Sequence, residues 1–449
     1  MRTIGKYQIL GLLGRGGMGV VYKAQHLQLG HIAALKVLSP SDILEAVVGT
    51  QELERRFLLE ARTMAGLRHE NIAPVWDMGH DDTGRPYFVM EYCCNNVGAV
   101  IGETYRVEEP SRVLRIDRAV DIVRQALSGL ARLHSAAIIH RDVKPFNLLL
   151  ENSGRVRLID FGLSKLRGER LALHGSENVG SPYYAAPEQE ADPEAADARS
   201  DLFSVGVMLA RMLTGYLPQL SSEAPSSMNQ DLDAQWDAFL SRACAPAPHD
   251  RYPGALAMID ALDALMSAWQ ERTAGTCSLP EQVEMPVEAS AFGSEPRSEP
   301  LKTGPKVGPQ FFGLDALWRP VWFPATDYLA QSGGTILDRV SGLVWESGGS
   351  QYPLTREDAV AYVAKLNRDR FAARVNWRLP TVPELMTLLR PVAHGRDFCI
   401  EPLFHTDRVL LWSADSRSFT SAWSANAELG FITHHDNTCH LFARAVCLA

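Results

Sequence analysis

Two short strings in the middle of the chain contain the residue types that phosphoryl transfer needs. The run HRDVKPFN covers residues 140–147, and the run DFG covers residues 160–162. Together they supply two carboxylates, an amide and the ammonium group of Lys144. Phosphoryl transfer requires an in-line attack and neutralisation of phosphate charge by metal ions, so one proton acceptor and two metal-binding groups suffice. The two strings therefore indicate transfer of a phosphoryl group from ATP.

A glycine-rich run near the amino terminus offers a place for the phosphates. The run GRGGMGVVY covers residues 14–22, and its glycines let a backbone approach phosphates closely. Dinucleotide sites share the G-x-G-x-x-G spacing, but there the run opens a helix. Here β-branched and aromatic residues follow, which predicts a strand rather than a helix. The run would then form a β-hairpin that covers a bound nucleotide.

Lys36 and Glu60 are predicted to form an ion pair beside this hairpin. Residues 33–37 read as a strand that carries Lys36. Residues 54–67 read as a helix with Glu60 inside an otherwise apolar stripe. A carboxylate in that position needs a cation, and Lys36 is the candidate. The rival carboxylates at positions 52 and 54 fall away from the stripe.

With these features in place, residues 7–269 resemble a protein kinase, nearest to the bacterial serine/threonine kinases of eukaryotic type. The resemblance includes the Ala-Pro-Glu string at 186–188. It implies a two-lobed α+β kinase fold, ATP and Mg²⁺ as cofactors, and a protein substrate with a serine or threonine. Lys144 follows Asp142 by two residues, as in serine/threonine rather than tyrosine kinases.

The resemblance also implies a role for each residue of the site. Lys36 would hold the α and β phosphates and pair with Glu60, while Asp142 would accept the proton of the substrate hydroxyl. Lys144 would steady the γ-phosphate. The implied magnesium ligands are Asn147 and Asp160, and the implied phosphate loop comprises Gly14, Gly16, Gly17 and Gly19.

Adenine binding and regulation follow from the same resemblance. The implied adenine pocket comprises Val21, Ala34, the gatekeeper Met90, and the hinge residues Glu91 and Cys93. The implied regulatory residues are Arg141, which could pair with a phosphate, the switch candidate Ser176, and Ser181 near the acceptor. Structural roles are expected for His140, Phe161, Met64 and Asp201, and for an ion pair between Glu188 and Arg251. The segment 93–110 lacks the usual acidic, glycine-rich opening after the hinge.

Composition limits the remaining function classes. The chain has 449 residues, 46% of them hydrophobic, and a net charge of -9, which argues against nucleic acid as a partner. No apolar stretch approaches the roughly 20 residues of a membrane span, and no signal peptide is evident. Its 7 cysteines lack metal-ligand spacing, so reduced thiols in a cytoplasmic protein are expected.

The chain is expected to contain two domains joined by a linker. Residues 270–310 are rich in Pro, Glu, Ser and Gly, which predicts a flexible linker. Aromatic residues return in 311–449, where short strands and two helices, at 355–367 and from 384, predict a compact α+β unit.

This second unit resembles the Lcl C-terminal domain, a C-type-lectin-like fold related to formylglycine-generating enzymes. The resemblance rests on strings such as WRLPTVPEL at 377–385 and FARAV at 442–446. It implies a domain that binds an unknown ligand or protein through loops late in the chain. The predicted contact residues are Trp423, Asn426, His434, His435, Asp436 and Asn437.

Several alternatives remain open at this point. The chain could be a pseudokinase scaffold whose binding domain is the functional part, although the intact site residues argue against this. The C-terminal loops could belong to a variable protein of a diversity-generating retroelement. The late loops could also be ordinary polar loops without a ligand. Formylglycine-type chemistry would need a pair of cysteines, and Cys439 and Cys447 are the candidates. A metal site near His434 is a further alternative, but the spacing fits no established zinc pattern.

Overall fold

The structure is a computed structural model of the chain. It describes residues 2–16, 18–104, 106, 108–161, 182–192, 195–274, 296–391 and 398–449. The chain divides into two compact units, residues 1–276 and 277–449. Each unit has its own elements and is described by itself.

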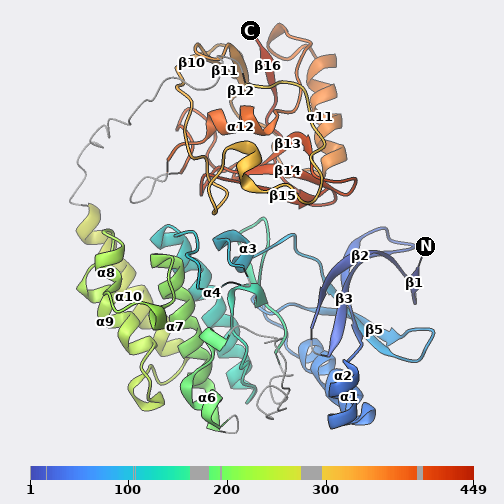
Figure 1. Cartoon of the computed structure of the whole chain (residues 1–449), viewed down its shortest axis with the longest axis vertical. Coiled ribbons are helices and arrows are strands. Elements are labelled where there is room, and N and C mark those ends of the chain that lie inside the picture. Colours follow the sequence, from blue (N-terminus) through green and yellow to red (C-terminus); the bar gives the residue numbers. More distant parts are fainter. Residues whose placement is uncertain are drawn as a thin grey trace. The chain divides into compact units, whose positions relative to one another are not determined.

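The first unit begins with an antiparallel sheet of the order β1-β2-β3-β4-β6-β5. Its strands are β1 (Thr3–Ile4), β2 (Tyr7–Arg15), β3 (Gly19–His26), β4 (Ile32–Leu38), β5 (Val75–His80) and β6 (Pro86–Glu91). Helices α1 (Asp42–Val48) and α2 (Thr50–Gly66) accompany the sheet (Figure 1). The buried stripe of α2 includes Glu60 among Phe57, Ala61 and Met64, which confirms the predicted helix face.

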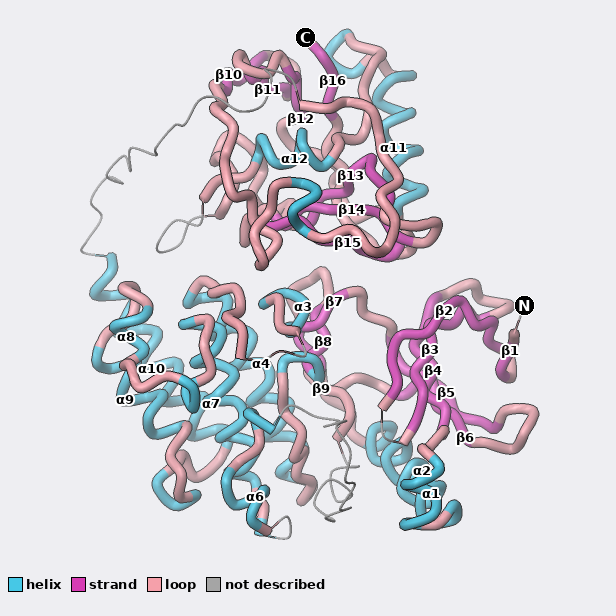
Figure 2. The backbone as a smooth tube through the Cα atoms, viewed as in Figure 1, coloured by secondary structure: helices cyan, strands magenta, loops and turns pink. Residues whose placement is uncertain are grey.

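The rest of this unit is mainly helical, so that one lobe holds the six-stranded sheet with α1 and α2 and the other holds most of the helices (Figure 2). The helices are α3 (Val97–Ile101), α4 (Ile116–Ser135), α6 (Pro187–Ala191), α7 (Ala198–Thr214), α8 (Pro225–Met228), α9 (Ala234–Ala243) and α10 (Ala255–Ala274). Helix α7 is buried along almost its whole length and forms the centre of this lobe. A small sheet of β7 (Asn95–Asn96), β8 (Leu148–Leu150) and β9 (Val156–Leu158) carries the loops of the site.

Among its described residues, the second unit contains two sheets and two α-helices. One sheet has the order β10-β11-β12-β16, from strands β10 (Tyr328–Gln331), β11 (Thr335–Asp338), β12 (Leu343–Glu346) and β16 (Val446–Leu448). The other has the order β13-β14-β15, from β13 (Leu410–Ser416), β14 (Ser421–Asn426) and β15 (Phe431–Asp436). The helices are α11 (Arg356–Arg368), capped by Thr355 as predicted, and α12 (Val382–Leu388).

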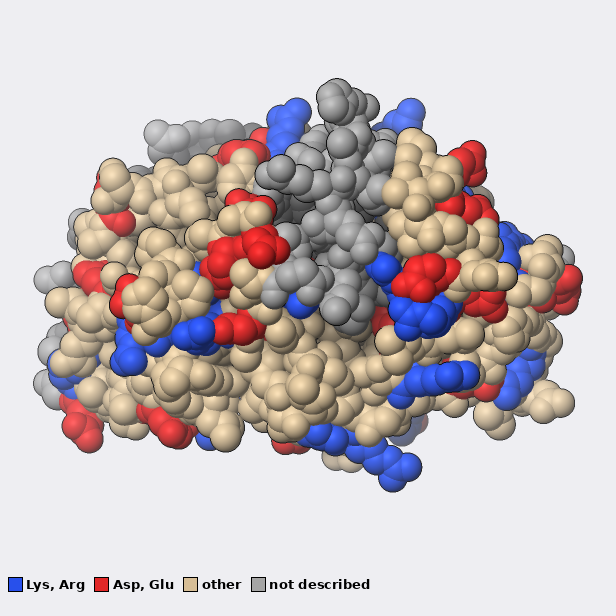
Figure 3. Space-filling view, turned by 90° about the horizontal axis from the view of Figure 1, so that it is seen from below, with Lys and Arg blue, Asp and Glu red and all other residues tan. Residues whose placement is uncertain are grey.

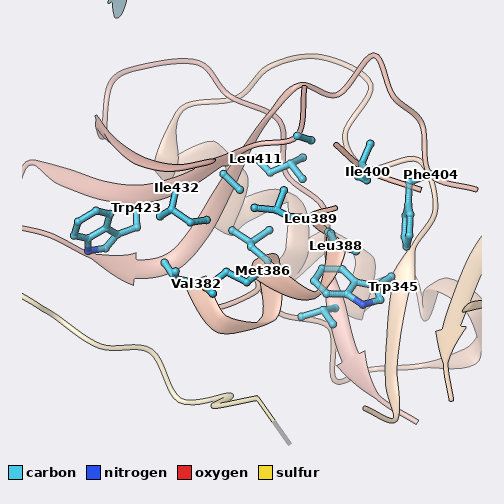
Figure 4. Close-up of a cluster of buried hydrophobic side chains, with 14 of the residues drawn as sticks. Trp345, Val382, Met386, Leu388, Leu389, Ile400, Phe404, Leu411, Trp423 and Ile432 are labelled. Carbon is cyan, nitrogen blue, oxygen red and sulfur yellow. The ribbon is translucent and has the colours of Figure 1, made fainter. Parts of the chain in front are cut away.

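An apolar core joins the two sheets and helix α12 of this second unit. Figure 4 shows side chains of α12, among them Val382 and Met386, between Trp345 of β12 and Trp423 of β14. Both tryptophans are fully buried. Burying such large aromatic side chains is the main stabilising contribution in a domain of this size.

Residues 296–310 differ from the sequence-based expectation. They were predicted to belong to a flexible linker, yet Arg297 forms an ion pair with Asp415, and Leu301 and Thr303 hydrogen-bond to Ser416. This stretch therefore belongs to the second unit. The polar composition of this stretch predicted a flexible linker. Composition does not reveal that Arg297 has a binding partner, Asp415, far along the chain.

The described residues contain no helix that is long and apolar enough to cross a bilayer. On the face shown in Figure 3, acidic and basic side chains are interspersed. As far as the described residues show, this face has no extended basic field of the kind that attracts nucleic acid.

Candidate active site

Lys36 lies at the centre of a buried charge cluster. Its Nζ is 3.0 Å from Glu60 Oε1 and 2.7 Å from Asp160 Oδ1. Strand β4 supplies the lysine and helix α2 the glutamate, so the two elements are held in register by this pair. Burial raises the pKa of the Glu60 carboxyl, and Lys36 opposes that shift. Burial alone would lower the pKa of Lys36, but the two carboxylates raise it, which keeps the ammonium charged.

The predicted proton acceptor, Asp142, is held by its neighbours in the same loop. Asn147 Nδ2 donates to Asp142 Oδ2 and to the Asp142 carbonyl, both at 2.8 Å. Lys144 Nζ is 3.1 Å from Asp142 Oδ2. These contacts fix the carboxylate next to a cation that can contact a phosphate, as the spacing of the string predicts.

The loop that carries Asp142 is anchored from below by Asp201. The fully buried Asp201 carboxylate accepts from the backbone N–H of His140 at 2.9 Å and of Arg141 at 2.7 Å. His134 Nε2 lies 2.8 Å from the same carboxylate. Arg141 has a φ of 61°, a left-handed conformation that costs about 1 to 3 kcal/mol. The Asp201 contacts offset this strain and fix the direction of the loop.

The glycine-rich run forms the turn between β2 and β3. A Cβ on Gly19 would lie 2.5 Å from the carbonyl oxygen of Val37, so this position accepts only glycine without a shift. A Cβ on Gly14 or Gly16 would meet no atom within 4 Å, which leaves open space beside the run. Gly17 lies outside the described residues. The role of the run in holding phosphates stays a prediction.

The residues predicted for adenine lie on neighbouring strands. Ala34 of β4 pairs with Met90 of β6, and both are buried, while Val21 of β3 is half-buried. The Glu91 carboxylate is bound by Arg157, whose Nε lies 3.0 Å from Glu91 Oε2. Burial raises the pKa of the Cys93 thiol to about 12, so this cysteine is a neutral packing residue. The arrangement leaves the backbone of the hinge as the polar group that could bind a base.

Asn147 and Asp160 fit a divalent cation that keeps water and phosphate ligands. Asn147 uses its amide nitrogen for Asp142, so its oxygen is the atom that a cation could bind. Asp160 Oδ1 contacts Lys36, so the second carboxylate oxygen is the atom that a cation could bind. No cluster of three or more His, Cys, Asp or Glu side chains suited to a metal occurs among the described residues. Such a two-ligand set matches Mg²⁺, which retains waters and substrate oxygens.

The predicted regulatory residues are only partly described. Ser176 and Ser181 lie outside the described residues. Arg141 Nη1 is buried and has no hydrogen-bond partner within the described parts of the chain. The predicted structural pairs are present: Arg251 Nη1 lies 2.6 Å from Glu188 Oε1, and the rings of His140 and Phe161 are 5.9 Å apart.

Sequence reasoning missed a buried polar triad beside the site. Tyr184 donates its hydroxyl to Glu103 Oε2 at 2.6 Å, and Arg211 Nε lies 3.2 Å from the same oxygen. Glu103 belongs to the segment after the hinge whose unusual sequence was noted above. The available signals were a glutamate after the apolar run 97–101 and an arginine within the apolar helix α7. Neither signal identifies its partner, because the residues are distant in sequence.

Three of the residues predicted to form a ligand site in the second unit are buried. Trp423 is fully buried, and Asn426 and His435 are each 5% exposed. They belong to strands rather than loops: Asn426 accepts hydrogen bonds from the backbone of a tight turn, and His435 Nδ1 lies 2.8 Å from Ser424 Oγ. Trp423 packs in the apolar core, whereas Asn426 and His435 lie on the opposite face of the same sheet, and a contact of these three residues with a ligand stays a prediction.

The other three predicted residues lie nearer the surface. His434 is exposed, with its ring 5.8 Å from that of Trp423. Asp436 accepts from Thr438 N and Oγ1, both at 2.9 Å. Asn437 lines a cavity of about 450 Å³ together with the amino-terminal turn of α11. Their role in binding stays a prediction.

Comparison with known proteins agrees with the site geometry. Residues 7–265 match the protein kinase domain family, and residues 334–447 match the Lcl C-terminal domain family. The first match covers more than half of the chain. The chain therefore belongs to the protein kinase family and carries an Lcl C-terminal domain.

Several bacterial serine/threonine kinases are similar to the kinase part of the chain. Serine/threonine-protein kinase PksC of Streptomyces coelicolor is 35% identical over 276 residues, which cover 57% of this chain and 48% of PksC. Serine/threonine-protein kinase PknL of Mycobacterium tuberculosis is 34% identical over 275 residues, 58% of this chain and 65% of PknL. The solved kinase domain of PknI from Mycobacterium tuberculosis is 30% identical, covers 59% of this chain and 97% of that domain, and has a TM-score of 0.44. The chain spans about half the length of the curated relatives that it matches.

Proposed function

We propose that the chain transfers the γ-phosphoryl group of ATP to serine or threonine hydroxyls of proteins. The observation that carries this proposal is the double contact of Lys36 with Glu60 and Asp160 beside an Asp142 fixed by Lys144 and Asn147. The serine/threonine kinases among its relatives support the same substrate class.

Each described residue has a defined task in this reaction. Lys36 contacts the nucleotide phosphates, while Glu60 holds the lysine in place from helix α2. Asp142 orients the substrate hydroxyl and accepts its proton, and Lys144 contacts the transferred phosphoryl group. Mg²⁺ bound by Asn147 and Asp160 would neutralise charge on the phosphate oxygens. We place this activity in the cytoplasm, where ATP is available.

The proposal gives the C-terminal domain a binding role. This domain is a separate compact unit with its own core, and its resemblance to lectin-like folds would suit recognition of a ligand or protein partner. A cavity beside Asn437 offers a concave surface for such a partner. Binding by this domain would select which proteins the kinase domain meets.

The proposal is tested by following label from γ-³²P-ATP into a generic basic protein. We expect transfer by the wild-type chain in the presence of Mg²⁺, and none after chelation of the metal. The Asp142→Ala chain should give only background label, because the hydroxyl loses its proton acceptor. Equal background signals from both chains would show that the kinase domain is a scaffold without catalysis.

A further inference from the structure

Residues 296–303 form an arm that precedes the region matched to the Lcl family and lies along the C-terminal domain. We call this arm the strap. Its first anchor is Arg297, whose Nη1 and Nη2 donate to Asp415 Oδ1 and Oδ2 at 2.9 and 2.8 Å. Asp415 is completely buried. A bidentate contact with a buried carboxylate is among the stronger side-chain interactions in a protein.

The strap backbone continues this attachment along the end of strand β13. The N–H of Leu301 donates to Asp415 Oδ1 at 2.7 Å. Its carbonyl accepts from Ser416 N at 2.9 Å, and Thr303 N donates to the Ser416 carbonyl at 3.0 Å. The strap therefore lies as a short parallel addition to β13, with Lys302 paired to Ser416.

Thr303 fixes the other end of the strap to the core. Its hydroxyl oxygen accepts the indole N–H of Trp423 at 2.9 Å. Trp423 packs against Phe312 and Trp318, with ring centroids 5.0 and 5.5 Å away. A hydroxyl fits this position because it satisfies a buried donor at the edge of an aromatic cluster. A phosphate dianion in the same position would place charge beside apolar rings, at a high desolvation cost.

We propose that Thr303 is a phosphate acceptor for the kinase domain of this chain, and that its phosphorylation releases the strap. The proposal rests on the kinase function proposed above. In the reaction, Thr303 Oγ1 forms a bond to the γ-phosphorus of ATP while the bond from that phosphorus to the β,γ-bridging oxygen breaks. The hydroxyl proton passes to Asp142, and ADP leaves.

The docked strap shields its own acceptor. Thr303 is half-buried and its backbone is paired with Ser416, so it reaches a kinase active site only when the strap opens. Opening requires loss of the Arg297 contact with Asp415. When the two domains of one chain meet, the acceptor is tethered to the kinase domain, and short flexible tethers give effective concentrations of about 1 mM. The rate of phosphorylation should therefore report the stability of the strap.

The test is a time course of the full-length chain with ATP and Mg²⁺, with phosphate sites assigned by mass spectrometry. Wild type should acquire phosphate slowly on Thr303, and the Asp142→Asn chain should acquire none. Arg297→Ala should raise the initial rate at Thr303 about tenfold or more, the factor for about 1.4 kcal/mol of lost docking energy. Arg297→Lys keeps the positive charge but loses the bidentate contact with Asp415. Its initial rate at Thr303 should lie between those of wild type and Arg297→Ala.

Arg339→Ala is the matched control, because Arg339 forms an exposed ion pair with Asp327 in the same domain. Its rate at Thr303 should equal that of wild type. A generic protein substrate in each reaction separates the two proposals. In Arg297→Ala, the substrate could be labelled while Thr303 carries no phosphate, or phosphate could appear on Ser298 alone. Either result would overturn the Thr303 assignment and leave the kinase function intact. No transfer to either acceptor would overturn both.

Release of the strap has its own readout. Hydrogen exchange of peptides that contain residues 296–303 should be faster in the phosphorylated chain than in the same chain after phosphatase treatment. Exchange in β12 should be unchanged, because that strand lies in the other sheet. Equal exchange of the strap in both forms would overturn release.

Discussion

Tyr184 and Glu103 are joined inside the kinase domain by a hydrogen bond of 2.6 Å, although 81 residues separate them in sequence. The bond connects the segment after the hinge to the end of the segment that contains Ala186-Pro187-Glu188. A parallel contact links the adjacent Tyr183 to Glu108, but that contact is exposed to solvent. The two neighbouring tyrosines thus make the same kind of bond in opposite environments.

Tyr184→Phe should weaken both folding and substrate binding. The change leaves a buried carboxylate one partner short, a loss of about 1 to 3 kcal/mol in the free energy of unfolding. The KM for a protein substrate should rise while the KM for ATP stays constant, since Tyr184 does not belong to the nucleotide site. Urea unfolding and steady-state kinetics measure these two effects.

Tyr183→Phe provides the control for this pair. It removes an exposed hydrogen bond of the same chemistry, so the free energy of unfolding should change by less than about 0.5 kcal/mol. If Tyr183→Phe and Tyr184→Phe weaken folding and substrate binding equally, burial is not what makes the Glu103 contact important.

Glu60→Gln should reduce catalysis through Lys36. The variant removes a charge-assisted hydrogen bond, worth about 1.5 to 3 kcal/mol, from Lys36, which we propose contacts phosphate. If that energy holds Lys36 in place during transfer, kcat/KM for ATP should fall about 10- to 100-fold. Steady-state kinetics at varied ATP gives this value.

Glu52→Gln is the control on the same helix. Glu52 binds Arg55 and Arg56 on the surface of α2 and not Lys36. Its kcat/KM should match that of wild type. A comparable loss in both variants would mean that the helix as a whole, and not the Lys36 contact, controls the activity.

His435 should make the C-terminal domain sensitive to acid. Burial lowers its pKa from 6.5 to about 4. The unfolded chain therefore binds a proton that the folded chain does not bind as the pH falls from 6.5 towards 4. Stability is retained above this window and is lost within it, by up to about 3 kcal/mol.

Pulsed hydrogen exchange of β14 and β15 after equilibration in urea measures this effect, with one common labelling pH. The unfolding midpoint of these strands should be lower at pH 4.5 than at pH 7. In His435→Gln the difference should shrink but not vanish, because the carboxylates and His434, whose pKa is also lowered to about 4, still titrate. An unchanged difference in the variant would exclude His435 as the cause.

The sequence predicted which residues of the candidate active site come together, because most of them belong to short, local strings. Asp142, Lys144 and Asn147 lie within six residues of one another and contact each other in the structure. Lys36 and Glu60 were paired correctly because a carboxylate within an apolar helix stripe demands a cation. The Glu103 contact was missed because nothing local specifies a partner so far along the chain.

Prediction was weaker in the C-terminal domain for two physical reasons. Late positions were taken as ligand-binding loops, whereas Trp423 and His435 lie in strands β14 and β15 and are buried. The arm at 296–303 was taken as a linker because its composition is polar, yet Arg297 pairs with a carboxylate 118 residues away. The composition of a segment shows whether the segment can form a core of its own. It does not show whether the segment can bind to a domain that is already folded.

Phosphate transfer by the Asp142→Asn chain, measured together with its affinity for ATP, tests the central claim most directly. The variant keeps Lys36, Glu60 and Asp160, so ATP should bind with wild-type affinity. Turnover should fall at least about 100-fold from a wild-type rate on the order of 1 to 100 per second, since a general base contributes that much. Wild-type turnover in Asp142→Asn would contradict the assignment of this residue and the mechanism built on it.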